Sequence, residues 1–273
     1  MEVWAMIVNW SELRREMLIE TQRIDFCKPA YWDKEADNFN QNVSQMKELT
    51  KQQLDRIPLL PQYTVLDVGA GTGRLTIPIA KRVQSVTALE PSPKMLDKLK
   101  ANAKKQHTVN IKYVNNSLDD LDISALETHD IVTASFSLFM LDMERALQKM
   151  DALASVGVYL FVSASEWMDT EIHDIVFGEG KSSTVLPDSV YMCNILHDIG
   201  INFNVDIWDF ESKQSYSDLE SATARFMQLY HVPAEKQVEL RSYLKKSLVQ
   251  DEKGKFWLNR KRKAAMIWWT KTQ

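Results

Sequence analysis

The stretch TVLDVGAGTGRLTIPIA, which runs from Thr64 to Ala80, decides the fold. It begins with an apolar run typical of a buried strand, continues through an acidic residue and three glycines at alternate positions, and ends in a helical pattern. Gly69, Gly71 and Gly73 carry no Cβ, so the backbone can turn sharply and a ligand can lie against it. The segment therefore predicts a ligand-binding turn between a strand and a helix.

Two common nucleotide-binding patterns do not fit this turn. A dinucleotide-binding turn reads G-x-G-x-x-G or A, whereas Arg74 stands three places after Gly71. A phosphate-binding P-loop, G-x-x-x-x-G-K-S or T, is absent from the sequence. The glycines therefore indicate a different kind of ligand.

Outward from the turn, short β-rich runs alternate with amphipathic stretches. This alternation is typical of an α/β fold, in which helices cover both faces of a mostly parallel sheet. We expect a seven-stranded sheet, and we interpret the basic centre of its last strand as a solvated turn. The expected strands span residues 64–68, 85–89, 111–114, 130–134, 157–163, 204–210 and 255–269.

The flanks of this pattern are helical. Residues 1–57 show apolar positions at helical spacing, broken near Pro29, and predict an N-terminal helical preface or lid. Two further helical patterns, at 217–230 and 233–249, predict an inserted helical cap over residues 212–254. The core would then consist of residues 58–211 and 255–273.

The composition excludes several classes of protein. A formal net charge of -4 and a pI near 5.8 disfavour nucleic acid and anionic membranes as partners. No run approaches the roughly 20 apolar residues of a membrane span, and the N-terminus lacks a basic leader. Cys27 and Cys193 are too few for a disulfide framework. We therefore expect a soluble, cytoplasmic protein with no partner in the membrane.

The segment Asp67–Gly73 reads D-x-G-x-G-x-G and closely resembles the first motif of the Rossmann-like, or class I, S-adenosylmethionine-dependent methyltransferases. Glu90 stands 17 residues beyond Gly73, where that family has its second acidic residue, and Ser92 and Met95 match the usual continuation. The lead-in AYWDKEADNFN, residues 30–40, is similar to that of small-molecule (type 11/25-like) members, in which it folds over the bound cofactor.

The resemblance implies a Rossmann-like fold and S-adenosylmethionine as the cofactor, with S-adenosylhomocysteine as the product. The glycine turn would embrace the amino-acid part, Glu90 the ribose hydroxyls, and Met95 the adenine. After the third strand the family often has an aspartate for the adenine amine, but this chain reads NNSLD at 115–119. The implied cofactor-binding residues are Tyr31, Asp67, Gly69, Ala70, Gly71, Gly73, Glu90, Pro91, Ser92, Met95, Asn116, Ser117, Leu118 and Ser135.

Catalytic residues are harder to assign. We expect direct in-line methyl transfer that needs no metal, because no cluster of His, Cys and carboxylates has ligand spacing. His173 and His197 are candidate general bases, with ordinary surface or packing roles as the alternative. Glu166 and Trp167 follow the fifth strand, at the face where ligands gather, and are candidates for contacting the acceptor.

Absent motifs narrow the acceptor. The chain has Ser135-Phe136-Ser137-Leu138 where base-amine methyltransferases usually carry N/D-P-P-Y/F, and neither cysteine supplies the Pro-Cys nucleophile common in pyrimidine-carbon methyltransferases. A small molecule with an oxygen, nitrogen or sulfur nucleophile is therefore the leading hypothesis. The alternatives are an RNA or protein methyltransferase that uses the basic run 260–263, and a non-catalytic S-adenosylmethionine-binding regulatory module.

Overall fold

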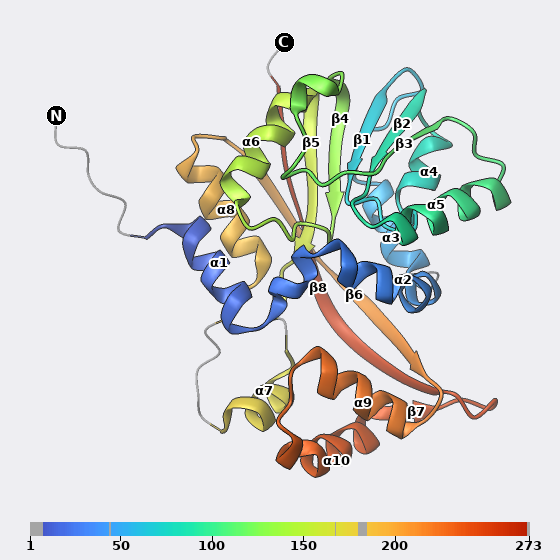
Figure 1. The fold of residues 1–273 in the computed structure, drawn as a ribbon, viewed down its shortest axis with the longest axis vertical. Helices are drawn as coiled ribbons and strands as arrows, with labels where there is room; N and C mark the ends of the chain where they lie inside the picture. The colour runs from blue at the N-terminus through green and yellow to red at the C-terminus, as the bar shows by residue number, and fades with distance from the viewer. Residues whose placement is uncertain (1–7, 44, 167, 180–184, 272–273) are drawn as a thin grey trace.

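The structure is a computed structural model that describes residues 8–43, 45–166, 168–179 and 185–271. Its centre is one twisted sheet with the strand order β3-β2-β1-β4-β5-β8-β6 (Figure 1). The first five strands run parallel. They are β1 (Thr64–Val68), β2 (Ser85–Leu89), β3 (Ile111–Val114), β4 (His129–Ser135) and β5 (Ala154–Ser163). The expected α/β class is confirmed.

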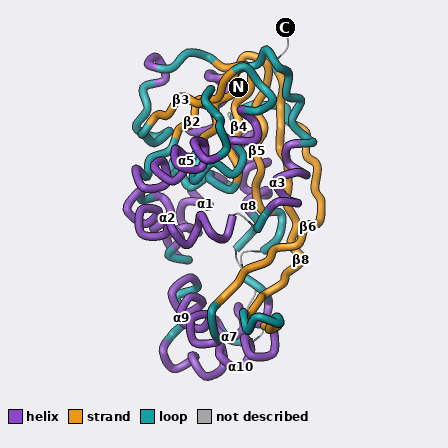
Figure 2. The backbone as a smooth tube through the Cα atoms, turned by 90° about the vertical axis from the view of Figure 1, so that its right-hand side faces the viewer, coloured by secondary structure: helices purple, strands orange, loops and turns teal. Residues whose placement is uncertain are grey.

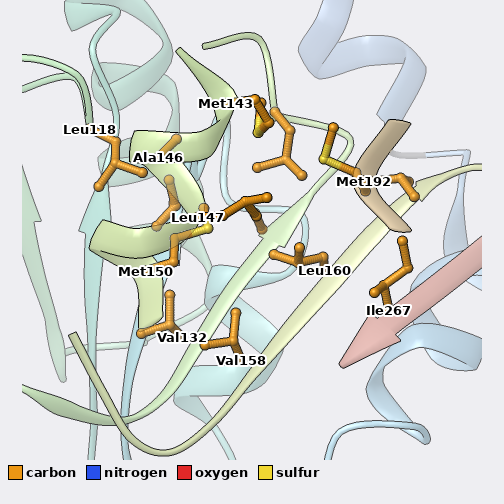
Figure 3. Packing of buried hydrophobic residues seen from close by; sticks show 14 of the residues in the cluster. Leu118, Val132, Met143, Ala146, Leu147, Met150, Val158, Leu160, Met192 and Ile267 are labelled. Atoms are coloured by element: carbon orange, nitrogen blue, oxygen red, sulfur yellow. The ribbon is translucent and has the colours of Figure 1, made fainter. Parts of the chain in front are cut away.

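Helices cover both faces of the sheet. On one face lie α3 (Lys47–Leu54), α4 (Thr76–Ala80) and α5 (Pro93–Lys105). On the other lie α1 (Trp10–Glu20), α6 (Met143–Leu153) and α8 (Asp188–Asp198). Figure 3 shows the apolar contacts of this second face, where Leu147 and Met150 of α6 pack near Val132 and Val158 of the sheet. Burial on both faces explains why the central strands are almost continuously apolar.

The strand count differs from the seven expected. An eighth strand, β7 (Leu248–Gln250), pairs with β8 (Phe256–Thr270) in a stretch that the sequence assigned to a helix up to residue 249. The helix α10 (Gln237–Ser247) ends two residues earlier, and Leu248 is already extended. Leu248 lies opposite Leu258, and both side chains are buried. Burial against β8 therefore outweighs helix continuation.

The expected turn at the centre of the last strand is also wrong. β8 is continuous and pairs antiparallel with β6 (Asn204–Tyr216) along its length from Phe256 to Trp268. Opposite charges face each other across this pair, because β6 places Glu211 opposite Lys261 and Asp209 opposite Lys263. The basic run is therefore stabilised as strand by acidic partners about 50 residues earlier in the chain.

β6 and β8 extend beyond the rest of the sheet and carry a second group of helices (Figures 1 and 2). This group has its own apolar cluster, which includes Phe226, Leu240 and Leu244. Its helices are α7 (Thr170–Phe177), α9 (Leu219–Leu229) and α10. None of the described helices has the length and apolar character needed to cross a bilayer.

Near the N-terminus, a short 3-10 helix, η1 (Arg23–Cys27), leads into α2 (Pro29–Val43), which lies along α5. Lys98 of α5 forms an ion pair with Asp37 of α2. One turn further on, the Asn102 side-chain amide donates to Asn40 Oδ1 at 2.8 Å. These polar contacts hold α2 beside the carboxyl ends of the parallel strands.

Candidate functional site

The turn after β1 requires its glycines. Gly69, Gly71 and Gly73 all have positive φ angles, of 70°, 55° and 92°, which L side chains rarely adopt. A Cβ at Gly69 would come within 2.8 Å of Ser137 Oγ, and one at Gly71 would lie 3.4 Å from the Phe39 ring. The conformation therefore disfavours other residues at all three positions, and at Gly69 the close approach of Ser137 excludes them as well.

Glu90 follows β2 and places its carboxylate against this turn. Its Oε2 accepts a hydrogen bond from the Gly71 N–H and its Oε1 accepts one from the Ser92 N–H, both at 2.8 Å. Burial raises the pKa of Glu90 to about 7, although these two hydrogen bonds oppose the shift. Each carboxylate oxygen has a further lone pair, so a donor hydroxyl of a ligand would stabilise the ionised form.

Asp67 lies behind the turn rather than in a cavity. It is buried in β1, and its Oδ2 accepts a hydrogen bond from the Thr76 hydroxyl at 2.6 Å. Burial raises its pKa to about 6. Through this hydrogen bond Asp67 joins β1 to the start of α4.

A cavity of about 770 Å³ opens at the carboxyl ends of β1, β2 and β4. Most of the predicted cofactor-binding residues line it: Gly69, Gly71, Glu90, Pro91, Met95, Asn116, Ser117, Leu118 and Ser135. Asp67, Ala70, Gly73 and Ser92 are not part of this wall, and Tyr31 lines a neighbouring cavity instead. We call this space the first cavity.

The loop after β3, which forms one side of the first cavity, is fixed by a buried lysine. Lys149 of α6 donates to three backbone carbonyls, of Leu118 at 2.7 Å, Asp119 at 2.8 Å and Leu121 at 2.9 Å. Only 8% of Lys149 is exposed. The sequence showed Lys149 as one more charge on an amphipathic helix, so its contact with the loop was not predictable.

The helix α2 covers the first cavity from the side opposite the sheet. Asp33 accepts hydrogen bonds from the Ser92 hydroxyl at 2.6 Å and from the Lys94 N–H at 3.1 Å, which joins α2 to the segment after Glu90. Trp32 and Phe39 of α2 line the cavity. The aromatic lead-in was the only signal in the sequence for this cover.

A second cavity of about 1670 Å³ adjoins the first, and the two share one wall of side chains. The shared residues are Phe26, Trp32, Phe39, Phe136 and Phe139. The second cavity lies between the end of β5, the ribbon of β6 and β8, and the helices α2 and α9. Sequence reasoning missed its aromatic wall, because Phe26 of η1 is distant in the chain from Phe136 and Phe139, which share the loop between β4 and α6.

The catalytic candidates differ in whether they line a cavity. Glu166 lines the second cavity, whereas neither histidine lines either cavity. His173 is buried in α7, with its ring 5.0 Å from that of Phe177, and His197 is exposed in the last turn of α8. Trp167 lies outside the described residues.

The walls of the first cavity fit a nucleoside with an attached cationic amino-acid chain. Glu90 offers acceptors for ribose hydroxyls, and Met95 and Leu118, both 2% exposed, offer apolar contacts for a base. The space in front of Gly71, which a side chain would narrow, leaves room for an approaching ligand. Trp32, Phe136 and Phe139 offer ring faces that attract a cation.

Comparison with known proteins places this site in context. Residues 65–157 match the family model described as a methyltransferase domain. An uncharacterised protein of Haemophilus influenzae is 26% identical over 268 residues, which is 96% of each chain. A 23S rRNA (uracil(1939)-C(5))-methyltransferase of Legionella pneumophila is 29% identical over 105 residues, but these cover only 23% of its length and 38% of this chain.

Solved structures share the fold at low identity. A putative methyltransferase of Bacillus halodurans has a TM-score of 0.56 at 14% identity, covering 82% of this chain and 99% of its own. The YcgJ protein of Bacillus subtilis has a TM-score of 0.52 at 14% identity, covering 86% of this chain and 99% of its own. The family model covers the segment that holds the glycine turn and Glu90.

Proposed function

We propose that this chain, a class I S-adenosylmethionine-dependent methyltransferase, transfers the methyl group to an oxygen, nitrogen or sulfur atom of a small molecule. The match of residues 65–157 to the methyltransferase domain supports the expected family, the enzyme class and the cofactor that fits it. The match does not identify the acceptor class, which we propose from the arrangement of the two cavities.

The observation that carries the proposal is the aromatic wall common to both cavities. A ligand held at the glycine turn and Glu90 would point its reactive end towards Phe136 and Phe139, beyond which the second cavity begins. Side chains of α2, α9 and β8 line the second cavity on several sides. A largely apolar concave site with a few polar groups is typical of pockets that bind a metabolite-sized acceptor.

We assign the residues of the first cavity to the cofactor. Glu90 would accept hydrogen bonds from the ribose hydroxyls, Met95 and Leu118 would contact the adenine, and the backbone of Gly69 and Gly71 would contact the amino-acid part. Two other candidates would support the site without contacting the cofactor. Asp67 accepts a hydrogen bond from Thr76, and Ser92 donates one to Glu90 and one to Asp33. Tyr31 belongs to the acceptor side in this assignment, because it lines the second cavity.

S-adenosylmethionine held by the glycine turn, Glu90 and Met95 would supply an electrophilic methyl carbon to the acceptor's lone pair, and its sulfur would keep the electron pair of the carbon–sulfur bond. The chain contributes by holding the acceptor in line with that carbon, which lowers the entropic part of the barrier. The cover formed by α2, the aromatic wall and the cap of residues 212–254 excludes water. A proton lost from the acceptor would pass to solvent or to Glu166, a catalytic candidate that lines the second cavity.

The partial likeness to rRNA methyltransferases does not extend this proposal to RNA. The matched region covers 23% of the Legionella protein and leaves most of it without a counterpart here. Burial raises the pKa of the Cys27 thiol, which lines the first cavity, and so disfavours a thiolate nucleophile. Three members of the basic run, Arg260, Arg262 and Lys263, pair with aspartates.

The test is a calorimetric titration of the purified protein with S-adenosylmethionine, S-adenosylhomocysteine and NAD, with Glu90→Ala beside the wild type. We expect the first two ligands to bind and NAD not to bind. Glu90→Ala should lose about 1.5–3 kcal/mol of binding free energy, because a charged hydrogen-bond acceptor is removed. Unchanged affinity in the variant would refute the assignment of Glu90. Binding without turnover on any acceptor would favour the regulatory module.

A further inference from the structure

The second cavity contains an unusual number of arginines for a wall that is mostly apolar. Five guanidinium groups line it, from Arg14, Arg23, Arg225, Arg260 and Arg262. The carboxylates of Glu35, Glu166 and Asp188 line it as well, and Asp169 contacts two of the arginines. In this described wall, five cations therefore face four carboxylates, and one positive charge is in excess.

The pairing within the wall is uneven. Arg225 pairs with a carboxylate that none of the other four arginines uses, because its Nη2 lies 2.9 Å from Glu35 Oε2. Arg260 and Arg262 instead share Asp169, whose two oxygens lie 2.6 Å and 2.8 Å from their Nη2 atoms. The Asp169 carboxylate also accepts a hydrogen bond from the Tyr243 hydroxyl at 3.1 Å. Two guanidinium groups thus face a single carboxylate that a third donor already uses.

The carboxylate of Glu166, which also lines the second cavity, does not neutralise this pair. Glu166 is exposed, and it is its backbone carbonyl, not its carboxylate, that accepts a hydrogen bond from Arg262 Nη1 at 3.1 Å. Water screens an exposed charge far more than a buried one. The side chains of Arg260 and Arg262 are only 12% and 18% exposed. Their excess positive charge therefore acts mainly on whatever occupies the cavity.

One buried donor also lacks an acceptor. Arg260 Nε has no hydrogen-bond partner among the residues that the structure describes. Its Nη2 lies 2.6 Å from Asp169 Oδ2 as an ion pair without hydrogen-bond geometry. Its Nη1 donates to the Tyr230 hydroxyl at 3.4 Å, and its carbon lies 5.1 Å from the centre of the Phe226 ring. A buried N–H without a partner is costly, and a ligand oxyanion would satisfy it.

Apolar and aromatic side chains form the remaining wall. The Phe136 and Phe210 ring centres lie 6.4 Å apart, and the Trp32 and Phe139 centres lie 5.7 Å apart. Leu258, which is 3% exposed, lies two residues before Arg260 on the same face of β8. The surface therefore suits a flat apolar body at one end and an anionic group at the other.

We infer that the methyl acceptor is an aromatic or similarly flat apolar molecule that carries a carboxylate, and that Arg260 and Arg262 bind this carboxylate. The inference rests on the proposed function, because it assigns the second cavity to the acceptor. Arg260 and Arg262 are binding residues in this reading, and they take no part in the transfer of the methyl group. The strand itself offers a control, because Lys261 is exposed on its opposite face.

The test compares two fluorescent probes that share their rings but differ in charge. Anilinonaphthalenesulfonate carries an oxyanion, and phenylnaphthylamine does not. Both are titrated into wild type, Arg262→Met and Lys261→Met, with and without S-adenosylhomocysteine. We expect Arg262→Met to weaken the sulfonate probe about tenfold, through loss of a charge-assisted hydrogen bond, and to change the neutral probe less than about twofold. Lys261→Met should bind both probes as wild type does.

A purely structural role for Arg262 would give a different result. It would lower the melting temperature and weaken both probes alike, and that outcome overturns the inference. So does a sulfonate probe that fails to bind wild type or binds Arg262→Met equally well. S-adenosylmethionine is titrated into the same samples as a separate readout. If S-adenosylmethionine does not bind while the two probes still respond differently to Arg262→Met, the methyl-donor site is refuted and the anion site is not.

Discussion

The pKa of Glu90 makes cofactor binding depend on pH in a direction that can be predicted. Burial raises this pKa to about 7 in the free protein. Ribose hydroxyls donate hydrogen bonds, so they favour the ionised carboxylate, which only accepts them. Affinity for S-adenosylmethionine should therefore rise as pH increases through 7 and should level off once Glu90 is fully ionised.

The magnitude follows from the ionised fraction. With a pKa of about 7, roughly one tenth of the Glu90 side chains are ionised at about pH 6 and roughly nine tenths at about pH 8. If only the ionised form binds, the dissociation constant should fall about tenfold between these two values, which corresponds to about 1.4 kcal/mol.

The assay is isothermal titration calorimetry across this pH range on wild type and Glu90→Gln. Glutamine keeps the size of the side chain but cannot titrate, so the variant should bind more weakly at high pH and show little slope. Asp67, with a pKa raised to about 6, is present in both proteins, and its contribution cancels in the comparison. A flat wild-type profile, or an equal slope in the variant, would refute the reasoning.

Two further predictions concern the walls of the first cavity. Gly69→Ala should cost about 2–4 kcal/mol in the free energy of unfolding, because the new Cβ collides with Ser137 and the residue must keep a positive φ. Gly200 also has a positive φ but has open space around it, so Gly200→Ala should cost about 1 kcal/mol. Urea denaturation of both variants measures the difference, and equal losses would contradict the steric argument. Lys149→Met should cost about 2–4 kcal/mol in the free energy of unfolding, because two buried carbonyls and a partly buried one lose their donor. It should also weaken the binding of S-adenosylmethionine, since the freed loop lines the cavity. Wild-type stability with wild-type affinity would show that water replaces the ammonium group without loss.

The sequence predicted best those elements whose signals are local. The strands at 64–68, 85–89 and 111–114 have the expected bounds, because each is a short apolar run that ends in a turn or an acidic residue. The close approach of Gly71 and Glu90 also follows from local order, since neighbouring parallel strands bring their carboxyl ends to one edge.

What the sequence could not show depends on partners that are distant in the chain. The basic centre of β8 has the composition of a turn, and only the acidic residues of β6 explain why it stays extended. The sequence also does not show where a side chain points. His173 and His197 have suitable chemistry, but neither lines a cavity. The aromatic wall combines residues more than 100 positions apart, such as Phe26 and Phe139.

The position of β8 in the sheet has a consequence for how the molecule assembles during synthesis. β8 lies between β5 and β6, although it is made about 40 residues after β6 leaves the ribosome. Until β8 is present, β6 has no neighbour in the described sheet, and the edge of β5 stays unpaired. A nascent chain that ends before Phe256 would therefore expose the open edge of β5 and leave β6 unattached, so the completed sheet, and with it one wall of the second cavity, forms only with the last strand.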